Sequence, residues 1–194
     1  GETGVGIETD TGCDIANSEV MDIEGERYAF GIRADSNSRV RSCVVGNIKS
    51  GGASCGIQVG EASRVVDSRA ASCRGTDEAS AGIRTGARSV IFECLSSGNS
   101  HRGLWVVDVS RAESNLSEMN GTIGLLADGP DNRIENNTVI SNACGIRVTG
   151  SGNTVIRNKA SGNAVSYGGL EIASNMWGVI ASTPTNDPDA NLEY

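Results

Sequence analysis

The chain has 194 residues, of which 38% are hydrophobic and only 4% aromatic, with 26 Gly, three Pro and a formal net charge of −8. This length suits one domain with a core of Val, Ile, Ala and Leu, which needs no metal or disulfide to fold. The acidic balance argues against binding to a phosphate backbone, so we expect no nucleic acid partner. No apolar run approaches 18 residues, so we expect no membrane insertion.

A tetrapeptide made of Gly, an apolar residue, any residue and a small or apolar residue recurs along the chain. Successive Gly residues of this motif are separated by 25, 25, 26, 21, 21, 21 and 24 positions. In a strand, positions two and four share one face and position three takes the other. The eight copies start at Gly6, Gly31, Gly56, Gly82, Gly103, Gly124, Gly145 and Gly169.

Two further positions recur after each Gly. An apolar residue follows by nine or ten positions, at Ile15, Val40, Val65, Ile91, Ile134 and Val155. An Asn follows by 16 to 18 positions, at Asn47, Asn99, Asn120, Asn142 and Asn163. Asn tolerates the left-handed turn conformation, and stacked Asn amides can hydrogen-bond to one another. We therefore expect Asn turns that stack from repeat to repeat.

Stacking of the repeats closes a continuous core, since one repeat cannot bury its own apolar face. No window shows helical spacing. A leucine-rich repeat needs more than the seven Leu present, and a sandwich would not place the same residue types at one offset eight times. We predict an all-β, right-handed parallel β-helix of about eight coils over residues 1–174, closed by a short capping tail over residues 175–194.

The coils resemble the right-handed β-helix repeats of the pectate-lyase-like superfamily. The resemblance is clearest in Asn132–Asn137, Gly145–Gly150 and Ser151–Asn158. The ending from Asn175 to Tyr194 resembles the closing segment of secreted bacterial members, which implies a secreted or cell-surface location in a bacterium. The superfamily includes lyases, glycosidases and tailspikes, so the resemblance implies the fold more strongly than any activity.

The two ends of such a solenoid expose unpaired strand edges. We expect the tail, with Pro184 and Pro188, to fold over the C-terminal edge, because Pro resists further strand pairing. For the N-terminal edge near Gly1, three explanations stay open. They are a region upstream of the given sequence, a partner such as a second copy of the chain, and an unusually short cap.

Six cysteines are present. Cys43 and Cys94 share an offset but lie two coils, or roughly 10 Å, apart, which is too far for a disulfide. Counted backwards from the next Gly, Cys73 and Cys94 share a column in adjacent coils and form the one bridge that the repeat allows. The alternative, which we favour, is that most cysteines are small, reduced core residues.

The third position of the tetrapeptide points outward and forms a stripe along one face. An exposed Trp can stack on a sugar ring, and Arg can form a fork to a carboxylate. We therefore predict a polysaccharide partner with ligand-binding residues Arg33, Arg84, Trp105, Asp108 and Arg147. The alternative is a solvated row of Arg with the Trp packed under a neighbouring loop. The full stripe reads Glu8, Arg33, Gln58, Arg84, Trp105, Leu126, Arg147 and Glu171.

Three functions stay open for such a molecule. The first is a non-catalytic secreted or surface module that binds carbohydrate or another surface. The second is a small polyuronate lyase or a fragment of one, for which Arg84, His101 and Arg147 are weak catalytic candidates of the right types. The third is a structural stalk or tailspike-like segment. A glycosidase is disfavoured because no Asp-Asp dipeptide occurs.

Metal ligands are sparse in the sequence. Asp10 and Asp35 share an offset in adjacent repeats and are weak candidates for Ca²⁺, together with backbone carbonyls. Turn-forming Asp is the alternative that we favour, so we expect no cofactor. Zinc is disfavoured because the chain has no CxxC pair and no Cys–His cluster.

Overall fold

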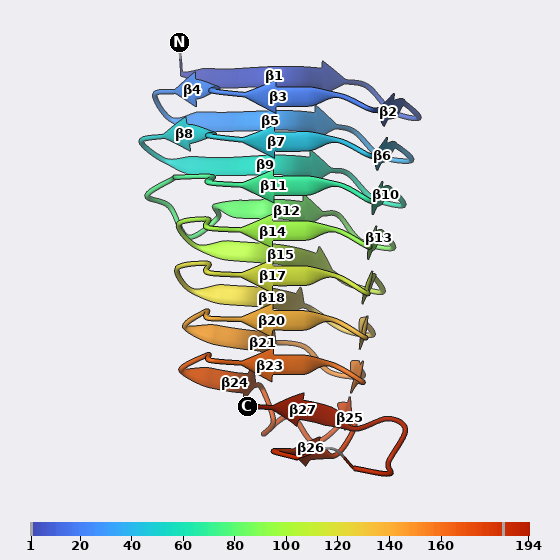
Figure 1. Ribbon diagram of the computed structural model, residues 1–194. Coiled ribbons are helices and arrows are strands. Elements are labelled where there is room, and N and C mark those ends of the chain that lie inside the picture. Colours follow the sequence, from blue (N-terminus) through green and yellow to red (C-terminus); the bar gives the residue numbers. More distant parts are fainter. Residues whose placement is uncertain (1, 184) are drawn as a thin grey trace.

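The computed structural model describes residues 2–183 and 185–194, and these form strands, turns and bends without a helix. The strands build three long parallel sheets of eight, eight and nine strands, wound as one solenoid (Figure 1). The prediction of an all-β parallel β-helix of about eight coils is confirmed. Within the described part of the chain, no helix has the length and apolarity that crossing a membrane requires.

Each coil contributes one strand to each long sheet, except that the last coil adds two strands to the third sheet. The first sheet contains β1 (Thr3–Thr9), β5 (Tyr28–Ala34), β9 (Ala53–Val59), β12 (Ala81–Thr85), β15 (Arg102–Val107), β18 (Ile123–Asp128), β21 (Cys144–Val148) and β24 (Val165–Gly168). The second contains β2 (Asp14–Ala16), β6 (Arg39–Arg41), β10 (Arg64–Val66), β13 (Val90–Phe92), β16 (Arg111–Glu113), β19 (Arg133–Glu135), β22 (Thr154–Ile156) and β25 (Met176–Trp177).

The third sheet contains β3 (Glu19–Met21), β7 (Val44–Gly46), β11 (Arg69–Ala71), β14 (Leu95–Ser97), β17 (Leu116–Glu118), β20 (Thr138–Ile140), β23 (Lys159–Ser161), β27 (Asn191–Glu193) and β26 (Ile180–Ala181). A short pair, β4 (Glu24–Gly25) and β8 (Lys49–Ser50), lies beside the first coils. The first sheet has the longest strands, so it offers the broadest outer surface.

The core is a set of apolar columns that run through the coils. Ile32, Ile57 and Ile83 are register partners on the first sheet, and the column continues through Leu104, Leu125 and Ile146. All six side chains are fully buried. Each contributes about 1.5–3 kcal/mol by leaving water. The expectation that the repeated Ile residues share one interior wall is confirmed.

The Asn column expected in the turns is present between the third and first sheets. Asn99 Nδ2 donates to Asn120 Oδ1 (2.8 Å), Asn120 to Asn142 (3.1 Å) and Asn142 to Asn163 (3.0 Å). Asn47 does not belong to this column, because Ile48 takes the inward position and Asn47 instead donates to Asp22 outside. The left-handed conformation belongs to the residue before each ladder Asn, namely Gly98, Met119, Ser141 and Gly162.

Two more turn columns change from Ser or Cys in the early coils to Asn in the later ones. Between the second and third sheets, Asn115, Asn137, Asn158 and Asn191 are linked amide to amide at 2.9–3.0 Å. Between the first and second sheets, Ser38, Ser63, Ser89 and Ser110 precede Asn132, Asn153 and Asn175. Each of these side chains accepts a backbone N–H from the previous coil, so buried turn amides are satisfied.

The Cys73–Cys94 bridge, which the repeat allowed but which we did not favour, is absent. The backbone N–H of Cys73 is bonded to Asn99 and that of Cys94 to Asn115, so the two cysteines lie in different turn columns. Counting back from the next Gly placed Cys73 and Cys94 in one column by error. Cys73 shares its turn column with Asn99, but the loop after Cys73 is longer than the loop after Asn99. All six cysteines are free thiols, and Cys43, Cys55, Cys73 and Cys94 are buried, as the alternative expected.

The eighth repeat does not begin at Gly169. The 21-residue spacing continues, so Tyr167 pairs with Ile146 and Gly168 with Arg147. Tyr167 is buried, donates to the carbonyl oxygens of Asn158 and Leu192, and packs edge-on against Trp177. Leu170 is about half exposed. The eighth tetrapeptide is therefore a turn segment that resembles a strand motif.

The final segment continues the solenoid rather than leaving it. β25 extends the second sheet, and β27 and β26 extend the third (Figure 1). Arg157 fastens this segment to the coils, because its Nη2 contacts Asp189 at 2.8 Å and its Nε donates to the carbonyl oxygen of Pro188. Pro184, also expected in the tail, lies outside the described residues.

Candidate functional site

The strand register brings the outward stripe of the first sheet into one column. Arg84 is paired with Gln58 on one side and Trp105 on the other, and Arg147 with Leu126. The column ends at Gly168, so the placement of Glu171 in it is wrong. Leu126 is buried although its strand position is outward, which shows that its neighbours cover it.

A second outward column lies three residues before the first. Gly103 and Leu104 both face the interior, because a Cβ on Gly103 would touch Ser117 and Asn120 of the core turns. Two consecutive inward residues interrupt strand alternation, so Arg102 and Trp105 both face outward from β15. The column reads Val5, Phe30, Cys55, Ala81, Arg102, Ile123, Cys144 and Val165.

Trp105 carries two guanidinium groups over its ring. The Cζ atom of Arg84 lies 4.1 Å from the ring centroid and that of Arg102 lies 4.4 Å away. Cation–π attraction of this kind holds each guanidinium in a fixed place. The ring is only partly exposed and its Nε1 is buried without a hydrogen-bond partner among the described residues. The face therefore presents two positioned cations rather than the bare aromatic platform that the stripe suggested.

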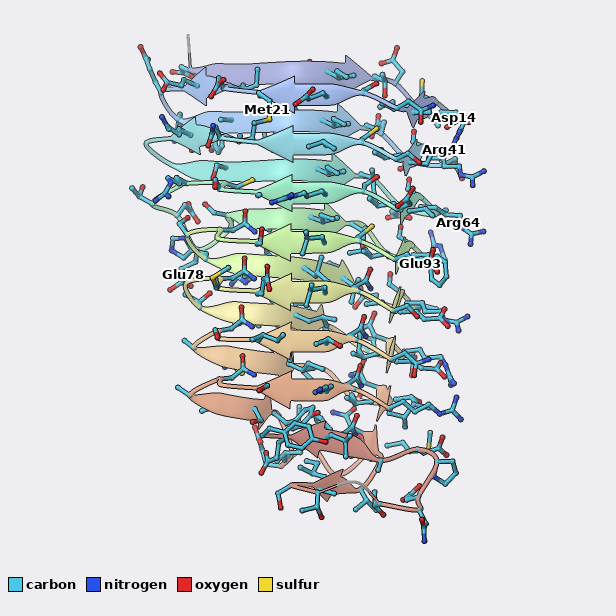
Figure 2. All side chains as sticks on the ribbon, viewed as in Figure 1. Asp14, Met21, Arg41, Arg64, Glu78 and Glu93 are labelled. Carbon is cyan, nitrogen blue, oxygen red and sulfur yellow. The ribbon has the colours of Figure 1, made fainter. Side chains whose placement is uncertain are left out.

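Beside this stack, the Arg102 depression holds about 360 Å³ and is lined by Arg102 and Arg147 together with Glu78, His101, Thr122, Ile123, Ala143 and Cys144. Arg102 is a register partner of Ile123, which is in turn paired with Cys144. Glu78 comes from the loop between β11 and β12, on the side of the solenoid away from Asp14 and Arg41 in Figure 2.

His101 lines the same depression, next to the Ser100 hydroxyl. Ser100 Oγ donates to the carbonyl oxygen of Gly75 at 2.9 Å and lies 3.1 Å from His101 Nδ1. Because the hydroxyl proton is used on Gly75, Nδ1 of the neutral ring is assigned as the donor to Ser100. Nε2 then carries the free lone pair, which is the form that a general base or an acceptor requires.

The other predicted residues line neighbouring depressions. Arg84 and Asp108 share the Arg84 depression, about 430 Å³, with Gln58 and Glu61 among its walls. Arg33 lines the Arg33 depression, about 200 Å³, where it contacts Glu8 at 3.3 Å. Arg33 also lies over Phe30, at 5.2 Å from the ring centroid. The structure thus groups Arg84, Trp105 and Asp108, places Arg147 beside Arg102, and leaves Arg33 apart with its charge already compensated.

Asp10 and Asp35 lie together in the Arg33 depression with Glu8. Arg33 stands among them, and its positive charge opposes a bound cation. The described residues contain no group of three His, Cys, Asp or Glu side chains placed to hold a metal ion.

Two side chains that line the Arg102 depression have shifted pKa values. Burial is the main cause that lowers the pKa of the Arg102 guanidinium; the carboxylates of Glu78 and Asp128 oppose this effect, and the charges of Arg84 and Arg147 add to it. Burial also raises the pKa of the Cys144 thiol, against the charge of Arg147. Within residues 2–183 and 185–194, Arg84, Arg102 and Arg147 have no ion pair.

The chain matches the family model described as right handed beta helix region over residues 3–180. The match covers most of the chain, so the protein belongs to this family and its solenoid is right-handed. No curated protein and no solved structure shows significant similarity to it.

Arg102 is the site residue that sequence reasoning missed. Simple alternation from Trp105 puts position 102 on the inner face, where a charged residue would be excluded. The Gly of each tetrapeptide gave the signal that Arg102 faces outward. Because Gly has no side chain, Gly and the Ile or Leu after it can both take inward positions. With that shift, the residue before each Gly is outward, and Arg102 becomes visible.

Proposed function

We propose that the protein is a non-catalytic β-helix module that binds an extended polysaccharide along the outer face of its first sheet. Such a module would act outside a bacterial cell or on its surface, where polysaccharides are exposed. The family supports a binding, structural or enzymatic module in general, so the proposal depends on this face.

The observation that carries the proposal is a row of connected depressions. The Arg33 and Arg84 depressions share Gln58 and Gly60. The Arg102 depression shares Cys144 and Arg147 with the Gly168 depression, which holds about 440 Å³. Arg84 and Arg102, stacked over Trp105, join the two halves.

A linear polymer fits this row better than a compact ligand does. The row crosses the strands, so a chain lying in it meets an equivalent position at every coil, about 4.8 Å apart. Binding sites of this kind gain affinity from each further subsite that the ligand fills. Arg, Gln, Thr and Asp side chains in the lining offer the donors and acceptors that sugar hydroxyls need.

Binding of an oligosaccharide series of increasing length, by calorimetry on the full chain, tests the proposal. We expect affinity to rise with length, and to fall in Gln58→Ala, Trp105→Ala and Arg147→Ala. Arg69→Ala on β11, which belongs to another sheet, is the matched control and should bind normally. Binding that is independent of length, or an equal loss in the control, would contradict the proposal.

A polyuronate lyase is the second candidate. The favouring observation is that His101, with a free Nε2 lone pair, shares one depression with Arg102 and Arg147. A base beside two groups able to neutralise a carboxylate is the minimum for β-elimination. Ultraviolet absorbance from unsaturated product, lost in His101→Ala, would establish the lyase. A stalk would show neither binding nor product, with assembly that depends on concentration.

A further inference from the structure

We infer that the Arg102 depression is an anion-binding subsite, and that Arg102 makes the module select acidic over neutral saccharides. The inference rests on the proposed function of the same face. It specifies the charge of the ligand and the residue that recognises this charge. The group recognised is a carboxylate or a sulfate on the sugar.

Arg102 lacks partners for its charge in the described structure. Its Nε and Nη1 atoms are buried without a hydrogen bond in the described structure. Glu78 and Asp128 are near enough to influence its charge, yet neither comes within 4.0 Å as an ion pair. An unpaired, partly desolvated guanidinium is costly, and an anion that supplies the missing acceptors removes that cost.

Among the arginines of the described residues, Arg102 alone has buried side-chain nitrogens without a hydrogen-bond partner. Arg33, Arg41 and Arg88 each contact a carboxylate of a neighbouring coil. On the second sheet, Arg111, Arg133 and Arg157 surround Glu135. Exposed arginines such as Arg64 and Arg69 also have no ion pair in the described structure, but water surrounds them. The part of the first sheet around Trp105 differs because its unpaired Arg102 is partly buried, beside two further unpaired arginines.

The Arg102 guanidinium is preorganised for a ligand. Stacking on Trp105 holds the Arg102 guanidinium at 4.4 Å before a ligand arrives, so less side-chain entropy is lost on binding. Arg147, on β21, lines the same depression and adds a second cation. Thr122 and His101 supply further polar groups. A planar guanidinium fork at the wall of a small hollow suits a carboxylate or sulfate.

The net charge of −8 does not oppose this assignment. Residues 1–26 contain eight Asp and Glu and no Lys or Arg, so the remaining chain has 16 acidic and 16 basic residues. The excess of acidic over basic residues thus lies in the first coil, at the N-terminal end of the solenoid (Figure 1). The Arg102 depression lies on β15 to β21, several coils away, where screening by salt makes the first coil's influence small.

The test compares acidic ligands with neutral ones that differ only at the charged group. Glucuronate oligosaccharides and their methyl esters, and a sulfated sugar beside its desulfated form, are titrated into the full chain. We expect the acid to bind at least tenfold more tightly than its ester, because hydrogen bonds to charged groups are the strong ones. The two pairs distinguish a carboxylate from a sulfate as the favoured anion.

Arg102→Met, which keeps the apolar stem over Trp105, should abolish the preference for the acidic ligand. The same variant should unfold at an equal or higher temperature than the parent, because it removes an unpaired charge. If Arg102 served only to stabilise the fold, Arg102→Met would instead lower the unfolding temperature. Arg69→Met is the control and should keep the preference. A preference that survives Arg102→Met, or an ester that binds as well as the acid, overturns the inference.

Failure of the two proposals can be told apart with free glucuronate and glucose. If glucuronate shifts the Nε–Hε resonance of Arg102 while no oligosaccharide length dependence is found, the anion subsite stands and the extended-polymer function fails. If oligosaccharides bind with length dependence but glucuronate and glucose act alike, the function stands and the subsite is refuted.

Discussion

Arg102 and Trp105 are three residues apart on one strand, yet both face outward, with the Arg102 Cζ atom 4.4 Å from the centroid of the Trp105 ring. Regular alternation would put them on opposite faces. Because Gly103 and Leu104 both face the interior, Arg102 and Trp105 emerge on the same outer face. Arg84 from the preceding coil completes the stack. The candidate site thus depends on a local interruption of the strand that every coil repeats.

Arg84 and Trp105 should be energetically coupled. A cation–π contact is worth about 0.5–2 kcal/mol, so a double-mutant cycle of Arg84→Met and Trp105→Ala should give a coupling of about 1 kcal/mol. The free energy of unfolding is measured in urea for the single and double variants. Arg33→Met combined with Trp105→Ala is the control, and its effects should add, since Arg33 lies over Phe30. Additive effects for Arg84 as well would argue against the stack.

Asn120→Ala should destabilise the solenoid by about 3 kcal/mol, since buried groups lose their partners. Asn120 Oδ1 accepts from the backbone and side-chain amides of Asn99, and its Nδ2 donates to Ser117 and Asn142. Thermal and urea unfolding measure the loss. Asn186→Ala, at an exposed Asn, should change stability by less than about 0.5 kcal/mol. Equal effects at the two positions would show that the ladder adds no stability.

The fold could be predicted because the same residue types recur at the same offset, and hydrophobic columns such as Ile32, Ile57 and Ile83 leave one way to bury them. The later Asn ladders escaped notice because the early coils place Ser38 or Cys43 at the equivalent turn. A Ser at this turn also accepts a backbone N–H from the previous coil. The same hydrogen bond therefore recurs along the column although the residue type changes.

Two alignments of the repeat were wrong because loop lengths vary from coil to coil. The tetrapeptide at Gly169 looks like a strand, but the 21-residue coil had already placed Tyr167 in the core. The loop after Cys73 has extra residues, which shifted the count for the disulfide. A period read from one motif locates the strands well and the loops poorly, because loops absorb insertions at little cost.

Acid should weaken the solenoid through Glu135. Its carboxylate is 6% exposed and contacts Arg133 Nε at 2.7 Å, Arg157 Nη1 at 2.9 Å and Arg111 Nη2 at 3.6 Å. The hydrogen bond from Arg133, with the charges of Arg133, Arg157 and Arg111, holds the pKa of Glu135 below its ordinary value of 4.5, against the effect of burial. Because the folded pKa is the lower one, this stabilisation is present above pH 4.5 and is lost as the pH falls through the folded pKa.

The urea midpoint, measured from about pH 7 to about pH 3, tests this dependence. Glu135→Gln should lose about 1–3 kcal/mol at neutral pH and should show a shallower decline in acid. Glu8→Gln is the control, since Glu8 is an exposed residue with one ion pair to Arg33 and should behave like the parent. A decline in acid that is unchanged by Glu135→Gln would assign the effect to other carboxyl groups.

Thiol labelling should separate the six cysteines into two classes. Cys13 and Cys144 are partly exposed, whereas the other four are buried. Burial raises the pKa of Cys55 and Cys94 to about 12, so few reactive thiolates form near neutral pH. With a thiol reagent, we expect two fast reactions in the native protein and six after unfolding without reductant. Fewer than six after unfolding would reveal a disulfide that the structure excludes.

The same reagent reports on the Arg102 depression, because Cys144 lines it and Cys13 does not. A saccharide bound there should slow labelling of Cys144 and leave Cys13 unchanged, which makes Cys13 an internal control. Cys144→Ser, followed by the same titration, assigns the protected thiol. Protection of both cysteines would indicate that the ligand stabilises the whole fold, and protection of neither would place the ligand elsewhere on the molecule.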